Sequence, residues 1–192
     1  MEGFIMIPIR YSKRTLTDQA QIDAFLSHAK VGNLGLSNGD EPYIVPLNFC
    51  WWNGQIYFHG ADSGRKVEMI DANSRVCFSV TEEYGTIADP IPAHTDTAYM
   101  SVFLSGTIAR VQEPEEMRDA MQAMLDKYVP GYYKEPLSLQ HVLKYRSSMG
   151  SVTAVFRITP DSLTAKGSPV PEEKLFYPGR TVGDDTGKPA QS

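Results

Sequence analysis

The chain has 192 residues, 42% of them hydrophobic and 21% charged, which suits one domain with a substantial core. Its net charge of −5 argues against a nucleic-acid backbone as the main partner. No apolar run could span a bilayer, and the first residues lack a signal-peptide pattern. Cys50 and Cys77 lack metal-ligand spacing and are expected to be small buried side chains. We therefore expect a cytoplasmic protein without a nucleic-acid, membrane or metal partner.

The first half of the chain predicts a helix followed by a β meander. Residues 18–29 carry apolar side chains at helical spacing after an Asp that can cap the helix. Extended segments are expected over residues 31–37 and 43–51. Asn53-Gly54 then predicts a tight hairpin into a strand over residues 55–59. These segments indicate three antiparallel strands.

The middle of the chain predicts two further strands around a long loop. Residues 75–81 alternate as a strand, and residues 98–111 return to strand with Gly106 at a bulge or bend. The intervening residues 82–98 hold prolines, a glycine and several acids, which predicts a long loop that could act as a lid.

The last part of the chain predicts one clear helix and one strand. The helix begins at Pro114 and carries an apolar stripe up to Tyr128, which favours core or subunit contact over a cofactor site. A strand is expected over residues 151–158. Strands dominate without a regular strand–helix alternation, which favours a mainly antiparallel β-barrel with peripheral helices. We expect one domain over residues 1–177 and a flexible tail over residues 178–192.

The segment from His59 to Val67 is the most informative part of the sequence. It reads His-Gly-Ala-Asp-Ser-Gly-Arg-Lys-Val and lies where a strand gives way to a helix. Free backbone N–H groups at such a junction favour an anion, and Arg65 and Lys66 suit phosphate oxygens. An N-cap at Ser63 followed by two solvated cations is the alternative, and the segment alone leaves both open.

A proline interrupts the extended run before the hairpin. Pro46 cannot donate a ladder hydrogen bond, so pairing there is interrupted or faces an edge. A flat ligand could use the backbone groups of Val45, Leu47 and Asn48. An edge strand protected from aggregation by its proline is the other interpretation.

Several ordered segments resemble one known family. They are Gly32-Asn33-Leu34-Gly35-Leu36, the run from Glu41 to Phe49, the run from Gly54 to Gly60, Gly64-Arg65-Lys66, Tyr99-Met100-Ser101-Val102, Gly106-Thr107-Ile108-Ala109 and the helix at Glu115-Glu116. Together they resemble the pyridoxamine 5′-phosphate oxidase-like flavin-binding proteins, and most of all the 5-nitroimidazole reductase (Nim-type) branch. The resemblance spans residues 10 to 166 and implies a six-stranded antiparallel FMN-binding split barrel.

The resemblance also implies a site. It implies a homodimer with two FMN molecules in clefts at the subunit interface. The flavin ring would lie along the backbone of Val45, Pro46, Leu47 and Asn48. The FMN phosphate would be held by Ser63, Arg65 and Lys66. His59 would lie near the flavin as the candidate catalytic residue, and Tyr99 and Ser101 would approach the cofactor from a neighbouring strand.

By resemblance, the expected function is a flavin-dependent reduction of a small acceptor such as a nitroaromatic compound. No G-x-G-x-x-G fingerprint occurs, so NAD(P)H would be a transient electron donor. The chain lacks a counterpart to the arginine-containing ending of the true oxidases, which disfavours vitamin B6 oxidation. A flavin- or haem-binding carrier or sensor is the alternative, and a dimeric domain with an empty ancestral site is the third interpretation.

Overall fold

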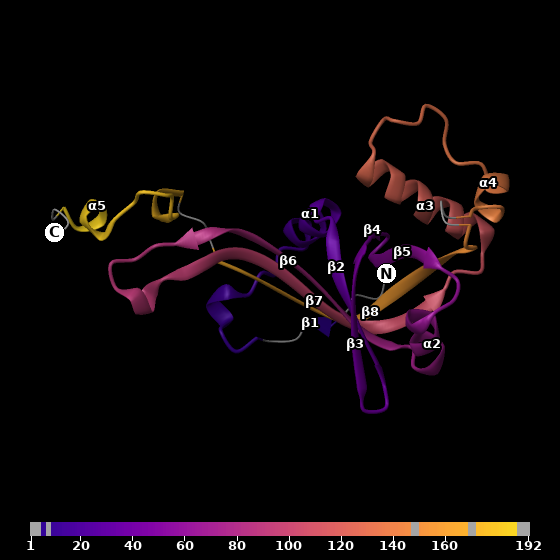
Figure 1. Cartoon of the computed structure of the whole chain (residues 1–192), viewed down its shortest axis with the longest axis horizontal. Helices are drawn as coiled ribbons and strands as arrows, with labels where there is room; N and C mark the ends of the chain where they lie inside the picture. Colours follow the sequence, from indigo (N-terminus) through magenta and orange to yellow (C-terminus); the bar gives the residue numbers. More distant parts are fainter. Residues whose placement is uncertain (1–4, 7–8, 147–149, 169–171, 188–192) are drawn as a thin grey trace.

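The structure is a computed structural model that describes residues 5–6, 9–146, 150–168 and 172–187. It consists of one mainly antiparallel sheet with helices at its periphery (Figure 1). The strands are β1 (Ile5–Met6), β2 (Val31–Asn38), β3 (Glu41–Asn48), β4 (Cys50–Trp52), β5 (Gln55–Ala61), β6 (Arg75–Ile87), β7 (Asp96–Arg110) and β8 (Thr153–Gly167). The helices are α1 (Gln19–His28), α2 (Arg65–Ala72), α3 (Pro114–Tyr128), α4 (Leu139–Leu143) and α5 (Val182–Thr186), with 3₁₀ turns at Ser12–Arg14, Pro92–His94 and Glu172–Lys174.

The strand order explains how this sheet becomes a barrel. The order is β3-β2-β6-β7-β8-β5-β4, with β1 added in parallel to β8. The two ends of this path, β3 and β4, are consecutive in the chain and are separated only by the fully buried Phe49. The sheet must therefore curl until its ends meet, which encloses the main core. The predicted class is confirmed, with eight strands instead of six because the run over residues 43–51 divides at Phe49 and β1 is added.

The local turn predictions are confirmed. Asn53 and Gly54 have φ angles of 51° and 72°, as a two-residue hairpin between β4 and β5 requires. The register between β7 and β8 shifts at Ser105/Gly106, where a bulge or bend was expected. The last strand is longer than the predicted residues 151–158 because β8 continues past the bulge along β7 to Gly167.

The predicted long loop over residues 82–98 is wrong. β6 continues to Ile87, β7 begins at Asp96, and these two residues pair with each other. The two strands form a long arm that projects from the barrel (Figure 1). The segment from Glu172 to Thr186 lies at the far end of this arm, where Leu175 forms a bridge with Ile87. The expected flexibility of residues 178–192 stays a prediction.

The helices close the barrel from outside. α2 buries Val67, Met69 and Ile70 in the main core. α3 buries its Met121 and Met124 against the outer side of β4 and β5, in a second cluster with Cys50 and Tyr57. No helix in the described part of the chain is long and apolar enough to cross a membrane.

Candidate functional site

The predicted anion site lies at the start of α2. The helix begins at Arg65, and its N-cap is Gly64 with φ 103°, a conformation that favours glycine. No side chain caps this helix, so the alternative of a Ser63 N-cap is wrong. The loop before α2 leaves Ser63 exposed beside the first turn of the helix. The backbone N–H groups of this turn therefore stand where a helix dipole favours negative charge.

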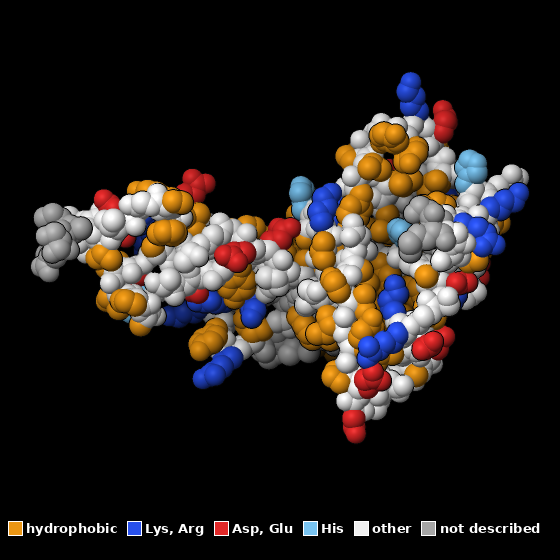
Figure 2. Space-filling view, in the orientation of Figure 1, with side chains coloured by type: hydrophobic (Ala, Val, Ile, Leu, Met, Phe, Trp, Pro, Cys, Tyr) orange, Lys and Arg blue, Asp and Glu red, His pale blue; other side chains and the backbone are white. Residues whose placement is uncertain are grey.

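Arg65 is already engaged at this site. Its guanidinium forms an ion pair with Glu41 at the start of β3, and it lies 4.4 Å from the ring centroid of Tyr43. Both charged side chains are 55% exposed, so solvent screens the pair and its contribution is small. Basic and acidic side chains are accordingly mixed on the face over α2 and the tip of the β2–β3 hairpin (Figure 2). An anion at this site would compete with Glu41 for Arg65.

Lys66 lies beside two aromatic rings of the core, on β5 and β8. Its ammonium lies 5.3 Å from the ring centroid of Phe58 and 6.0 Å from that of Phe156. A Cβ atom at Gly60 would lie only 2.6 Å from the ammonium nitrogen, so a glycine makes room for it. Burial lowers the pKa of Lys66, because partial loss of hydration disfavours the charged ammonium. A bound anion would replace part of that lost hydration.

Arg110 is a basic residue of this region that sequence reasoning missed. Its guanidinium lies 5.6 Å from the Phe156 centroid and donates a 3.1 Å hydrogen bond to the carbonyl oxygen of Asp62 in the loop before α2. Neither Arg110 nor Lys66 has an ion-pair partner among the described residues. Arg110 thus holds the loop that presents Ser63 and adds positive charge beside it.

β3 connects this charged region to a cavity. Within the described ranges it pairs with β2 alone, so its other edge carries no strand there, and Pro46 stands opposite Asn33. Val45 and Leu47 are half-buried on one face, whereas Pro46 and Asn48 are exposed on the other. The expected edge position of Pro46 is confirmed, and both interpretations of this proline, ligand contact and protection from aggregation, remain predictions.

The cavity lies at the far end of β3. It has a volume of about 450 Å³ and is lined by Asn48, His59, Met121, Met124, Leu125, Tyr128 and Tyr145. The first two residues come from β3 and β5, and the others belong to α3 or follow α4. The apolar stripe of α3, expected as core or subunit contact, therefore also forms one wall of a cavity beside the candidate catalytic histidine.

His59 is exposed on β5, yet the protein atoms around it lower its pKa, which favours the neutral imidazole. Desolvation is the main cause that lowers its pKa from 6.5, and the positive charge of Lys66 is the second. A neutral imidazole offers one N–H donor and one acceptor nitrogen. His59 can therefore hold or move a proton toward a molecule in the cavity at neutral pH.

The distance along β3 defines the kind of ligand that fits. Arg65 is anchored beside Tyr43 at one end of the strand, and Asn48 enters the cavity at the other. Five residues of antiparallel strand span about 17 Å. An elongated molecule with an anionic end and a flat ring could lie along this open edge.

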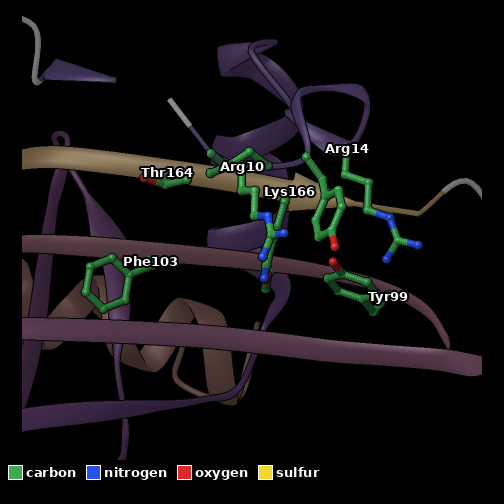
Figure 3. A pocket seen from close by; sticks show the side chains of 9 residues that line it. Arg10, Arg14, Tyr99, Phe103, Thr164 and Lys166 are labelled. Atoms are coloured by element: carbon green, nitrogen blue, oxygen red, sulfur yellow. The ribbon is translucent and has the colours of Figure 1, made fainter. Parts of the chain in front are cut away.

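Tyr99 and Ser101 lie elsewhere in the same chain. They line a separate cavity of about 530 Å³ on the outer face of β7 and β8 (Figure 3). His59 pairs with Val155 on β8, whereas Ser101 pairs with Lys166. These two positions on β8 are eleven residues apart, which is about 35 Å measured along the strand. One chain therefore brings together every predicted site residue except Tyr99 and Ser101.

A family model described as pyridoxamine 5′-phosphate oxidase matches residues 18–167. The chain belongs to this family. The matched region contains β2 to β8 and the whole lining of the His59 cavity. The residues between 9 and 14 that line the cavity of Tyr99 and Ser101, and the segment at the far end of the arm, lie outside it. A search of curated protein sequences found no significant match.

Three solved structures share the fold at low sequence identity. The flavocytochrome Anf3 from Azotobacter vinelandii is 18% identical over 95% of this chain and 79% of its own, with a TM-score of 0.71. A FAD and heme binding protein from Mycobacterium smegmatis is 17% identical over 88% and 92%, with a TM-score of 0.66. A candidate 5-nitroimidazole antibiotic resistance protein from Bacteroides thetaiotaomicron is 22% identical over 79% and 85%, with a TM-score of 0.63.

In this member of the oxidase family, we expect Lys66 to influence the charge state of His59. The Lys66→Met change removes a positive charge, so the pKa of His59 should rise, yet stay below 6.5 because desolvation remains. The pKa can be measured by NMR titration of the imidazole, with Lys134→Met as a control at an exposed lysine. An unchanged pKa would show that the two groups do not interact.

Proposed function

We propose that this chain is an FMN-binding oxidoreductase that reduces a small acceptor, such as a nitroaromatic compound, with NAD(P)H as external donor. The observation that carries the proposal is the open edge of β3, with basic groups at one end and the His59 cavity at the other. Membership of the pyridoxamine 5′-phosphate oxidase family supports a flavin ligand. The solved structures that share the fold include flavin-binding proteins and a candidate nitroimidazole resistance protein, which support the same class.

The residues present fit FMN. Ser63, Arg65, Lys66 and the backbone N–H groups at the start of α2 would hold the phosphate, and Arg110 would position their loop. The backbone of Val45, Pro46, Leu47 and Asn48 would run beside the ring along the open edge. Lys66 is partly desolvated and has no carboxylate partner among the described residues, so a phosphate would supply the missing negative counter-charge.

When bound, the flavin supplies the electron or hydride transfer. The protein contributes binding, orientation and proton handling. Met121, Met124 and Leu125 would offer an apolar wall to an aromatic acceptor. The neutral imidazole of His59 can donate a hydrogen bond to that acceptor or take a proton from it.

The proposal includes a homodimer. Tyr99 and Ser101 lie eleven residues along β8 from the position opposite His59 and line a separate cavity, so we place them outside the flavin site of their own chain. In a dimer with interfacial flavin sites, they would approach the cofactor of the partner subunit. Size measurement at micromolar concentration tests this part, and a monomer that still binds FMN would contradict it.

A carrier or sensor is the second candidate. His59 is neutral and faces a cavity with two methionines, and these residue types also ligate haem iron. The absorption spectrum of the purified protein, followed by release of any chromophore, distinguishes flavin from haem. Stoichiometric flavin that no nicotinamide nucleotide reduces would favour the carrier over the enzyme.

The role of His59 is tested by His59→Gln. We expect kcat for acceptor reduction to fall by about 100-fold, because general acid–base groups contribute on this order. The Kd for FMN should stay nearly unchanged, since the phosphate site is intact. His28→Gln is the matched control, at an exposed histidine in the last turn of α1. Wild-type turnover should fall only at a pH below 6.5, as His59 becomes protonated. Unchanged kinetics in the variant would reduce His59 to a structural residue.

A further inference from the structure

The cavity that contains Tyr99 and Ser101 is basic and aromatic. Tyr99, Ser101 and Phe103 line it from β7, and Thr164 and Lys166 line it from β8. The opposite wall is the segment before α1, which contributes Ile9, Arg10, Tyr11 and Arg14. The bridge between Thr15 and Lys166, and the 2.9 Å hydrogen bond from the Leu16 N–H to the Ala165 carbonyl oxygen, fix this wall to β8.

Two of the three cations in the cavity have no counter-ion. Arg14 forms an ion pair with Asp96, but Arg10 and Lys166 have no ion-pair partner in the described ranges. Figure 3 shows the side chains of Arg10 and Lys166 converging between Phe103 and Tyr99. Like charges that converge in a cavity repel each other unless an anion lies between them. The arrangement therefore favours an anionic ligand.

Aromatic rings surround these cations. Phe103 is 47% exposed and Tyr11 is 67% exposed, so both rings are accessible to a ligand. The ammonium of Lys166 lies 5.8 Å from the Tyr99 ring centroid, and the guanidinium of Arg10 lies 5.5 Å from that of Tyr11. A flat base could stack on such rings while its phosphate meets the two cations. The volume of about 530 Å³ is in the usual range for a ligand of this size.

We infer that this cavity binds a phosphorylated nucleotide at a second site, separate from the anion site of Ser63, Arg65 and Lys66 at the start of α2. The ligand chemistry is an aromatic base joined to a phosphate. Two sources share it: the nucleotide of a soluble nicotinamide donor, or the adenylate half of a FAD molecule held by the partner subunit. The inference of a nucleotide site is based on the residues that line the cavity, whereas the choice between these two sources rests on the proposed flavin function.

The experiment uses the full-length protein as purified, with AMP and adenosine as probes in calorimetric titrations. AMP should bind, and adenosine should bind at least about tenfold more weakly, because a charge-assisted contact is lost with the phosphate. The double change Arg10→Gln and Lys166→Gln should raise the Kd for AMP by about tenfold or more. The change Lys134→Gln removes an exposed lysine that does not line this cavity and should leave AMP binding unchanged.

Further measurements separate the outcomes. Thermal unfolding of each variant confirms that the chain is folded, and flavin absorbance during the titration shows whether AMP displaces flavin from the anion site at the start of α2. A raised KM for NADPH in the double variant supports the soluble donor, and a shift of released flavin from FAD to FMN supports the adenylate. A colourless protein that still binds AMP would contradict the flavin proposal but not this site. Absence of AMP binding, or equal binding by the double variant, would overturn the inference.

Discussion

Replacing Arg65 and Lys66 together by Ala is expected to raise the Kd for FMN by about 10- to 100-fold, while the Kd for riboflavin should change only slightly. Both ligands share the ring that would lie along β3, but only FMN has a phosphate to meet the two cations. Hydrogen bonds between charged groups contribute about 1.5–3 kcal/mol, which corresponds to the stated loss. Quenching of flavin fluorescence gives both Kd values. Equal losses for FMN and riboflavin would contradict the phosphate role.

The ion pair between Arg65 and Glu41 provides a change in the opposite direction. Glu41→Gln removes the carboxylate that competes with phosphate for Arg65, so FMN should bind a few times more tightly. The gain is expected to be small because both side chains are 55% exposed. Riboflavin should be unaffected, and Lys134→Ala serves as the charge-change control at an exposed position. Weaker FMN binding in Glu41→Gln would show that the carboxylate holds Arg65 in its binding position.

Features that depend on a few neighbouring residues could be predicted from the sequence. Asn53-Gly54 permits the positive φ angles of its turn, and Gly106 stands at the register shift because a side chain there would meet the next strand. The strand–loop–helix junction after His59 is equally local. Its helix begins at Arg65, since glycine at position 64 supplies an N-cap conformation without a side-chain cap.

Features that depend on strand order could not be predicted. Arg110 approaches the α2 loop because β7, β8 and β5 are neighbours, which places Arg110 opposite Phe156 and Phe156 opposite Phe58. No local pattern around Arg110 carries this information. The same holds for the wall that Met121 and Met124 add to the His59 cavity, because their helical spacing indicates burial but not the partner.

The arm formed by β6 and β7 was missed for a different reason. Beyond Thr81, β6 leaves the barrel, and its residues no longer alternate between core and solvent. Hydrophobic alternation is the main signal for a strand, so a strand exposed on both faces resembles a loop in sequence. Its pairing is maintained by the ladder with β7 and by the bridge from Leu175 to Ile87.

Gly106→Ala is expected to produce the largest loss of stability of any single change considered for this chain. A Cβ atom at this position would lie 2.2 Å from the carbonyl oxygen of Thr159 and 2.9 Å from its carbonyl carbon. Both atoms belong to the backbone of β8, which pairs with β7 and β5, so they cannot move without breaking the sheet. Overpacking of this kind costs about 3 kcal/mol, and the unfolding midpoint should fall by about 6–12 °C.

Two other glycines serve as matched controls for that change. A Cβ atom at Gly35 would lie 2.5 Å from the Sγ atom of Cys77, a side chain that can rotate, so Gly35→Ala should cost clearly less. Gly39 has open space around it but a φ angle of 58°, so Gly39→Ala should cost only about 1 kcal/mol of left-handed strain. The free energies of unfolding come from denaturant titrations. Equal losses at Gly106 and Gly39 would mean that the close approach of β8 does not determine the stability of the barrel.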